Sequence, residues 1–406
     1  MSISSLLRRS LRHVNRALPA SAVNRSSFQQ RSWSTITAGP SSLSVETLKT
    51  TFPYVWLRDS CQSPECIHPT TSQKLHKSSD VPLDVKPVED GVRLLDDGIA
   101  IEWMDGHKSH FSISFLERHS SLAKLAVFHK EVVSEPWDNR TITQTHDLFI
   151  SYGSLKTSEG LLAALKQISR YGLLFVKDVP HVETTNEKCE LSTLAEIFGY
   201  IRTTFYGRLW DVKNVRNSKN VAYTNLDLGL HMDLLVQGGQ SIFVDAVYCA
   251  SLLRNAHPSD FDILTTTPVP FHYINDGHHL HREHPTIELA SLAFGAPPGT
   301  ISHINYSPPF QAPLLRSTPD AFYPALRRFA EALNDSSNVY RYTLQEGDAV
   351  IFDNRRVLHS RTAFSDIDGQ KKEGETNRWL KGCYLEADDL LDRRRVLEAN
   401  LAVSSS

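Results

Sequence analysis

Short segments that alternate apolar and polar residues, separated by glycine and aspartate, constrain the fold of this chain most. The stretches "DGVRLLDDGIAIEW" (90–103) and "HKSHFSISF" (107–115) both have this pattern. Alternation is typical of half-buried strands, because successive side chains of a strand point to opposite faces of the sheet. We therefore predict a small β-rich N-terminal domain over residues 46–133.

The next segments predict a second, larger domain. "SEPWDNRTITQTH" (134–146) has neither strand nor helix periodicity and is predicted to be a linker. Residues 147–406 then form the second domain. Its first segment, "SEGLLAALKQISRYG" (158–172), has the spacing of a helix that Gly172 ends, and the apolar run "LLFVKDV" follows as a buried strand. The apolar face of this helix contains Leu161, Leu162, Leu165 and Ile168.

Further helices are predicted over 317–335 and 386–400, with two strands around the turn at 346–348. Acidic residues come first and arginines later in the last helix, as the helix dipole prefers. The predicted fold class is therefore mainly β with flanking helices.

The first 45 residues differ from the rest of the chain. They are rich in arginine and serine, contain no acidic residue, and place leucines at helical spacing. This composition is typical of a mitochondrial targeting segment, so we expect the mature protein in the matrix. A disordered basic tail is the alternative. The six arginines are Arg8, Arg9, Arg12, Arg16, Arg25 and Arg31.

Charge, hydropathy and cysteine usage exclude several classes of protein. The net charge is -3 and becomes more negative without the basic leader, which argues against a nucleic-acid partner. No apolar run approaches the roughly 18 residues of a membrane span, so no membrane association is predicted. Five cysteines, an odd number scattered along the chain, do not form the pattern of a secreted disulfide framework.

A candidate metal site begins in "GLHMDLLVQGG" (229–239). If His231 and Asp233 lie on one strand end, their side chains project from the same face and can bind one metal ion. A His-x-Asp pair is common by chance, so it needs a further ligand.

His359 supplies that ligand, because it directly follows an apolar strand in "GDAVIFDNRRVLHSR" (347–361). Two histidines and one carboxylate form the facial triad of non-haem Fe(II) sites, which leaves three positions for a 2-oxo acid and dioxygen. Arg378, in "NRWLKGCY" (377–384), has the side chain suited to grip the distal carboxylate of such a co-substrate.

At these motifs, together with "NVAYT" (220–224), the sequence resembles the carnitine-pathway 2-oxoglutarate dioxygenases, the γ-butyrobetaine and trimethyllysine dioxygenases. The resemblance covers nearly the whole chain after the leader. It implies a double-stranded β-helix (jelly-roll) catalytic domain, Fe(II), 2-oxoglutarate, ascorbate as an aid to activity, and a homodimer. By resemblance, the iron ligands are His231, Asp233 and His359, and the 2-oxoglutarate arginine is Arg378.

The resemblance also implies a trimethylammonium substrate, because four aromatic residues match the family's cage. A quaternary ammonium cannot donate hydrogen bonds and is held best by ring faces. Taken alone, each of these aromatic residues would more often be part of the hydrophobic core. Asn220 matches a residue that contacts the substrate carboxylate, with a structural amide as the alternative. The matching aromatic residues are Tyr206, Trp210, Tyr223 and Tyr384.

The implied reaction is hydroxylation of γ-butyrobetaine to carnitine. The alternatives are a trimethyllysine dioxygenase and a catalytically impaired homologue that binds a trimethylammonium ligand. Two departures from the family bear on this choice. Ser307 and Pro308 stand where the butyrobetaine enzyme has asparagines. About 17 residues, enough for one strand and its connection, are missing after the His-x-Asp motif.

The resemblance further implies a zinc site in the first domain. Cys61, Cys66 and His107 match three of its four ligands, but Ser63 replaces the middle cysteine. Serine is a poor zinc ligand, so either His68 substitutes or the thiols are free. The histidine-rich stretch "GHHLHREH" (277–284) is predicted to be a turn without a metal role.

Overall fold

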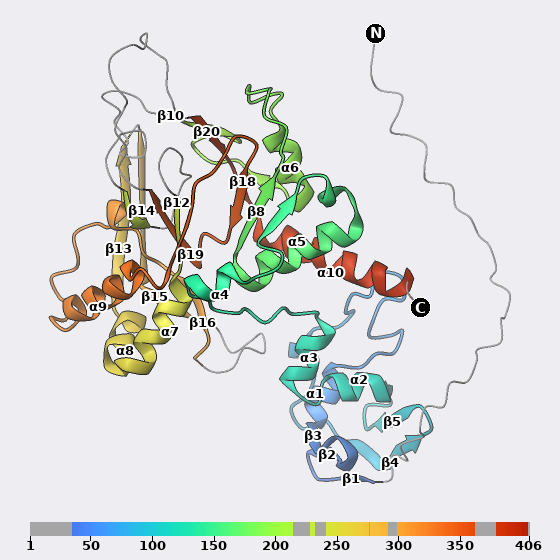
Figure 1. The fold of residues 1–406 in the computed structure, drawn as a ribbon. Coiled ribbons are helices and arrows are strands. Elements are labelled where there is room, and N and C mark those ends of the chain that lie inside the picture. The colour runs from blue at the N-terminus through green and yellow to red at the C-terminus, as the bar shows by residue number, and fades with distance from the viewer. Residues whose placement is uncertain are drawn as a thin grey trace, which may run out of the picture. The chain divides into compact units, whose positions relative to one another are not determined.

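The computed structural model describes residues 35–213, 228–231, 241–275, 277–290, 299–361 and 379–404. The chain divides into two compact units, one ending at Ser120 and the other starting at Ser121 (Figure 1). The sequence prediction extended the first domain to residue 133. In the structure the boundary precedes helix α3 (Leu122–Phe128), none of whose residues is buried, so α3 adds nothing to the first core. No described helix combines the length and apolarity that a membrane span requires.

The first unit contains two three-stranded antiparallel sheets that share one core. Leu43 and Phe52 from one sheet and Ile99, Trp103 and Phe111 from the other belong to a single buried cluster. The elements are β1 (Ile36–Ala38), β2 (Ser42–Val45), η1 (Glu46–Leu48), β3 (Thr50–Pro53), α1 (Tyr54–Asp59), η2 (Ser78–Asp80), β4 (Pro87–Leu95), β5 (Gly98–Trp103), β6 (Lys108–Ser112) and α2 (Ile113–Arg118).

The predicted strands of this unit are found, with one correction. β4 and β5 confirm the alternating pattern of 90–103. The stretch 107–115 is a strand only as far as Ser112, where α2 begins. The Ser112 side chain accepts a hydrogen bond from the backbone N–H of Phe115 at 3.2 Å. This N-cap is the local signal that ends the strand and starts the helix.

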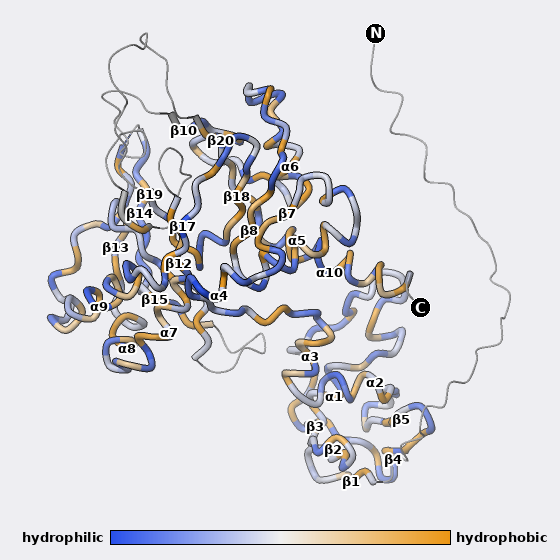
Figure 2. The backbone as a smooth tube through the Cα atoms, viewed as in Figure 1, coloured by the Kyte–Doolittle hydropathy of each residue, from blue (hydrophilic) through white to orange (hydrophobic). Residues whose placement is uncertain are grey.

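One sheet of the second unit has the order β18-β8-β7 and is built around a strand buried on both faces. In β8 (Leu173–Lys177), Leu174 and Val176 pack with helices α5 and α6, whereas Leu173 and Phe175 face the other sheet. Figure 2 shows this apolar run. The elements are β7 (Phe149–Ser151), η3 (Ser154–Lys156), α5 (Ser158–Tyr171), α6 (Glu190–Phe198), β18 (Ala349–Phe352) and α10 (Ala387–Ser404).

The second sheet has the order β11-β19-β12-β17 and is antiparallel throughout. Phe243 in β12 meets Phe175 of β8 at 5.6 Å between ring centroids, so the two sheets face each other. Val244 points the other way, into a cluster with three helices. The elements are β11 (Leu228–His231), β12 (Ser241–Asp245), α7 (Ala246–Ala256), α8 (Pro258–Thr266), α9 (Phe322–Asn334), β17 (Val339–Tyr342) and β19 (Val357–Arg361).

The second unit therefore has four layers: helices, sheet, sheet and helices. This arrangement confirms the predicted jelly roll with flanking helices. Two-stranded pairs and short elements complete it: α4 (Asn139–Thr143), β9 (Ile201–Arg202) with β21 (Tyr384–Leu385), β10 (Trp210–Lys213) with β20 (Trp379–Gly382), β13 (Pro268–Asn275) with β14 (His278–Pro285), β15 (Ile287–Leu289) with β16 (Ile301–Ile304), and η6 (Pro308–Phe310).

The helix predictions are most accurate where the sequence contains a capping residue at the end of the helix. α5 begins after Thr157, which accepts a hydrogen bond from Gly160 N–H, and ends at Gly172 with φ +70°. The predicted helix at 317–335 starts only at Phe322, and Ala321 before it offers no capping side chain. The strands around Gly347 exist, but β17 and β18 lie in opposite sheets and do not pair with each other.

A buried ion pair ties the second sheet to the segment before it. The Arg356 guanidinium lies 2.7 Å from the Asp245 carboxylate, which is fully buried. Arg356 also donates to Ser134 Oγ and to the Arg170 carbonyl, each at 2.7 Å. Asp245 in turn accepts the backbone N–H of Val247 at 3.0 Å and caps α7. Four segments distant in sequence therefore depend on this one pair.

Candidate active site and metal centre

His359 lies between the two sheets. It is fully buried in β19, and its register partner in β12 is Phe243, which faces the space between the sheets. The preceding residue, Leu358, belongs to the hydrophobic cluster on the opposite face of this sheet. The imidazole lies 4.9 Å from the ring of Phe352 at the end of β18. His359 thus points into the interior of the jelly roll.

His231 is brought to the same place along the backbone. In the antiparallel pair β11–β19, the Cα of His231 lies opposite the Cα of His359. Directly opposite residues of an antiparallel pair lie on the same face of the sheet. This register is the one that a shared metal site needs. Asp233, Arg378, Tyr223 and Asn220 lie outside the described residues.

Three of the four predicted cage residues form a contiguous aromatic group. The ring of Trp210 lies 6.0 Å from Tyr206 and 4.9 Å from Tyr384 between centroids. Trp210 is only 5% exposed, and its indole N–H has no hydrogen-bond partner among the described residues. Tyr206 lies in the loop just before β10 and Trp210 lies in β10, whereas Tyr384 in β21 is more than 170 positions further along the chain.

The aromatic group extends further than the sequence analysis predicted. The ring of Phe205 lies 4.1 Å from Tyr206 and 5.2 Å from Tyr273 in β13. Phe205 is 43% exposed, which is unusual for a ring that only fills a core. Its position next to Tyr206 in the sequence is the signal that could have identified it.

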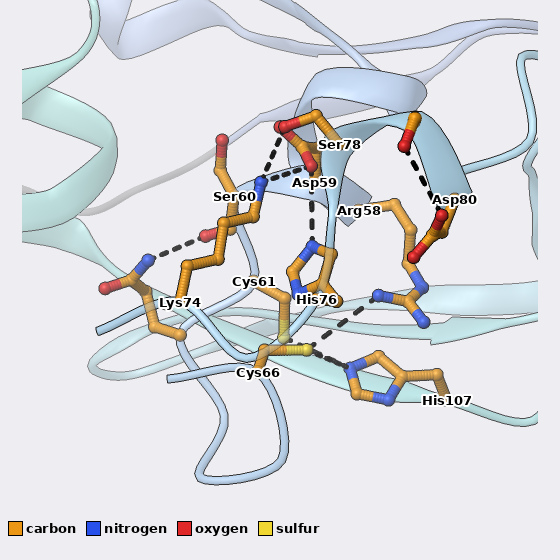
Figure 3. Close-up of polar contacts among 12 residues, drawn as sticks. Arg58, Asp59, Ser60, Cys61, Cys66, Lys74, His76, Ser78, Asp80 and His107 are labelled. Atoms are coloured by element: carbon orange, nitrogen blue, oxygen red, sulfur yellow. Dashed lines mark hydrogen bonds and ion pairs between the residues drawn. The ribbon is translucent and has the colours of Figure 1, made fainter. Parts of the chain in front are cut away.

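In the first unit, Cys61, Cys66 and His107 form a compact cluster (Figure 3). Their ligand atoms all lie within 4.8 Å of one another. The Nε2 atom of His107 is 3.2 Å from the Cys61 sulfur and 3.5 Å from the Cys66 sulfur. Both cysteines are buried. Among the described residues this is the one group of three or more ligands with such convergence.

Comparison with known proteins identifies the family. Residues 148–384, more than half of the chain, match the model described as "Taurine catabolism dioxygenase TauD, TfdA family". The chain belongs to the TauD/TfdA dioxygenase family. It is thus an oxygenase, as predicted. In this TauD-family chain, residues 43–120 also match "Gamma-butyrobetaine hydroxylase-like, N-terminal".

Three relatives of this TauD-family chain span most of its length. Dioxygenase str8 of Strobilurus tenacellus is 49% identical, covering 92% of this chain and 91% of that protein. Gamma-butyrobetaine dioxygenase of Pseudomonas sp. (strain AK-1) is 30% identical, covering 86% and 90%. Human mitochondrial trimethyllysine dioxygenase is 29% identical, covering 85% and 82%. The alignment with str8 spans 390 positions, which exceeds 92% of the 406 residues of this chain. The alignment therefore contains gaps in the sequence of this chain.

Charged groups surround the cysteine cluster of this TauD-family chain. Burial of the ring and the nearby Arg58 guanidinium lower the pKa of His107, which favours the neutral form that binds metals. Burial raises the pKa of the Cys66 thiol, so a metal ion must displace its proton. Arg58 lies 3.9 Å from the Cys66 sulfur and pairs with Asp105 at 3.2 Å. The donor set fits a soft divalent ion such as zinc, with one position open.

Ser63 is adjacent to the cluster, because its backbone N–H donates to the Cys61 sulfur at 3.4 Å, whereas His68 is not among the convergent ligand atoms. Ser63 Oγ is buried without a hydrogen-bond partner among the described residues. The Nδ1 atom of His68 accepts the backbone N–H of Thr71 at 3.3 Å. The histidine-rich stretch 277–284 is not a turn throughout, since it begins in one and continues as the exposed strand β14. Its described ligand atoms do not form a convergent group.

Proposed function

We propose that this chain is an Fe(II)- and 2-oxoglutarate-dependent hydroxylase of a trimethylammonium compound, with γ-butyrobetaine as the first candidate and carnitine as its product. The observation that carries the proposal is the pairing of His231 with the buried His359 on adjacent strands. Family membership supports the same chemistry.

In this proposal the residues of the chain hold and orient the reactants. His231, Asp233 and His359 bind iron, and the Arg378 guanidinium binds the distal carboxylate of 2-oxoglutarate. The bound iron, with 2-oxoglutarate and dioxygen, supplies the oxidising chemistry. Burial of His359 between the two sheets keeps bulk water away from this ligand.

The aromatic group of Tyr206, Trp210 and Tyr384 supports a quaternary ammonium as the substrate's charged end. Ring faces attract such a cation without hydrogen bonds. Asn220 would contact the substrate carboxylate. Trimethyllysine is the second candidate, because the same cage serves both compounds and Ser307 departs from the butyrobetaine enzymes. Ser307 is 9% exposed, and its hydroxyl has no partner among the described residues.

Succinate formation separates these candidates. The purified full-length protein is incubated anaerobically with Fe(II), 2-oxoglutarate and ascorbate, and then exposed to air with each substrate. We expect substrate-dependent succinate with γ-butyrobetaine, together with carnitine detected by mass spectrometry. Preference for trimethyllysine would select the second candidate. A folded protein that binds γ-butyrobetaine without producing succinate would instead be a non-catalytic homologue.

The gaps in the str8 alignment are consistent with a missing segment after the His-x-Asp motif, which would impair catalysis. Among the described strands, β11 forms one edge of the four-stranded sheet. An unpaired edge at this position would weaken the wall beside the proposed metal site. Sequencing the transcript across the codons for Leu235 and Val236 tests whether the native message is longer.

Replacing Trp210 with alanine should raise the KM for the trimethylammonium substrate about 3- to 30-fold, with a smaller effect on kcat, because a desolvated cation–π contact is lost. Trp210→Phe keeps a ring face and should retain most of the affinity. Steady-state kinetics with γ-butyrobetaine and with its uncharged tert-butyl isostere check this. An equal loss for both compounds would contradict a cation-binding role.

We also propose zinc at the Cys61/Cys66/His107 cluster, a homodimer, and delivery to the mitochondrial matrix by residues 1–45. Metal analysis of the dialysed protein, its molar mass by light scattering, and import into isolated mitochondria test these three proposals in turn.

A further inference from the structure

The cysteine cluster leaves the fourth position of a tetrahedral site open. A structural zinc ion takes four protein ligands, and Cys61, Cys66 and His107 supply three. We propose that His76 is the fourth zinc ligand, in place of the residue at position 63. This inference rests on the zinc site proposed above and is independent of the iron chemistry.

The backbone brings His76 to the cluster. The N–H of the preceding residue, Leu75, donates to the carbonyl of Cys66 at 2.8 Å. An antiparallel bridge between Ile67 and Lys74 continues this pairing. The segment that carries His76 is therefore fastened to the segment that carries Cys66.

Both ring nitrogens of His76 are buried and have no hydrogen-bond partner among the described residues. Nε2 lies 3.4 Å from Asp59 Oδ1, at the distance of an ion pair. Nδ1 has no such neighbour among the described residues and is the nitrogen available to a metal ion. Figure 3 shows this other edge of the ring turned toward the sulfurs of Cys61 and Cys66. A buried nitrogen without a partner is costly, and a metal ion would satisfy it.

His76 and His107 share the arrangement of metal-binding histidines. His107 directs Nε2 at the two sulfurs, while its Nδ1 lies 3.3 Å from a carboxylate oxygen of Glu65. His76 likewise has a carboxylate on the nitrogen that faces away from the sulfurs. Such carboxylates fix the ring orientation and make the ligand nitrogen more basic. Two histidines with this geometry beside two buried thiols form a Cys2His2 set.

The Asp59 carboxylate is itself well anchored. Lys74 Nζ donates to Asp59 Oδ1, and Ser78 Oγ donates to Asp59 Oδ2 at 3.0 Å. These contacts hold the carboxylate 3.4 Å from Nε2 of His76, where it can orient the ring.

A small movement closes the site. The ligand atoms of the other three residues already lie within 4.8 Å of one another, whereas His76 lies outside that limit. Tetrahedral zinc requires separations of about 3.5–3.8 Å between ligand atoms. The side chain of His76 is 20% exposed, so it is not locked by packing. Binding energy for the ion offsets the adjustment.

Zinc retention tests the assignment. Full-length wild-type protein and the variants His76→Gln and His68→Gln are dialysed, and zinc release to a chromogenic chelator is followed. Wild type and His68→Gln, the control from the same loop, should hold about one zinc per chain. His76→Gln should bind zinc at least about 100-fold more weakly, because loss of a ligand exceeds the effect of losing its outer partner.

Restoring a cysteine at position 63 supplies the decisive comparison. Ser63→Cys combined with His76→Gln should recover zinc retention, which a merely misfolded His76→Gln protein would not do. In cobalt-substituted protein, Ser63→Cys with His76→Gln should raise the thiolate-to-metal charge-transfer absorbance by about half, as two thiolates become three.

Two results would overturn the assignment while leaving the zinc site standing: unchanged zinc retention in His76→Gln, or a loss in Ser63→Ala as large as that in His76→Gln. Wild-type protein without zinc would overturn the zinc site and this inference together. Succinate formation, which depends on iron, reports separately on the hydroxylase proposal.

Discussion

Replacing His359 with alanine is expected to reduce substrate-dependent succinate formation at least about 1000-fold. The imidazole is fully buried between the two sheets, and the Cα of His359 is paired with the Cα of His231, so the change removes one of the three proposed iron ligands. Turnover under saturating Fe(II) and 2-oxoglutarate measures the loss. Anaerobic iron binding, followed by the charge-transfer absorbance of the iron–2-oxoglutarate complex, should fall in parallel.

A matched control is His281→Ala. His281 is an exposed histidine of β14, on the hairpin with β13. This variant should keep both the activity and the absorbance of the wild type. If folded His359→Ala protein, judged by its circular dichroism, retained iron and turnover, the proposed iron site would be wrong.

Replacing Arg356 with alanine is expected to lower the free energy of unfolding by about 3–5 kcal/mol, because it leaves the Asp245 carboxylate charged and buried without its partner. The change also removes hydrogen bonds to Ser134 and Arg170 and so releases the segment before the second sheet. Urea denaturation followed by tryptophan fluorescence measures the loss.

The neighbouring residue supplies a control for this variant. Arg355 donates to His303 on an exposed surface, so Arg355→Ala should cost less than about 1 kcal/mol. Replacing Arg356 and Asp245 together by leucine and methionine should recover part of the lost stability, because no unpaired charge remains. A loss below 1 kcal/mol in Arg356→Ala would show that the pair does not hold the segments together.

Local signals in the sequence predict the local elements well. The Thr157 and Gly172 caps define α5, and the apolar run of β8 predicts a strand buried on both faces. Where a competing cap is present, as at Ser112, alternation alone predicts a strand too long. Sheet partners are not predictable in this way, because pairing depends on contacts between distant segments. Nothing in the turn at Gly347 reveals that β17 and β18 join opposite sheets.

The residues of the candidate site show the same difference between local signals and contacts of distant segments. His359 is predictable because it follows the apolar run of β18, although it lies within the next strand, β19, and not at the end of that run. Tyr206 and Trp210 are predictable together because they are close in sequence. The Arg356–Asp245 pair joins residues 111 positions apart and has no local signature. His76 is equally hidden, since its relation to Cys66 arises from the pairing of Leu75 in a loop.

The double burial of β8 limits how this protein can be divided. Leu174 and Val176 pack against the helical layer, while Leu173 and Phe175 pack in the space between the sheets. A fragment that kept only one of these layers would leave a row of apolar side chains facing water and would aggregate. The smallest autonomous piece of the second unit must therefore contain both sheets with their covering helices.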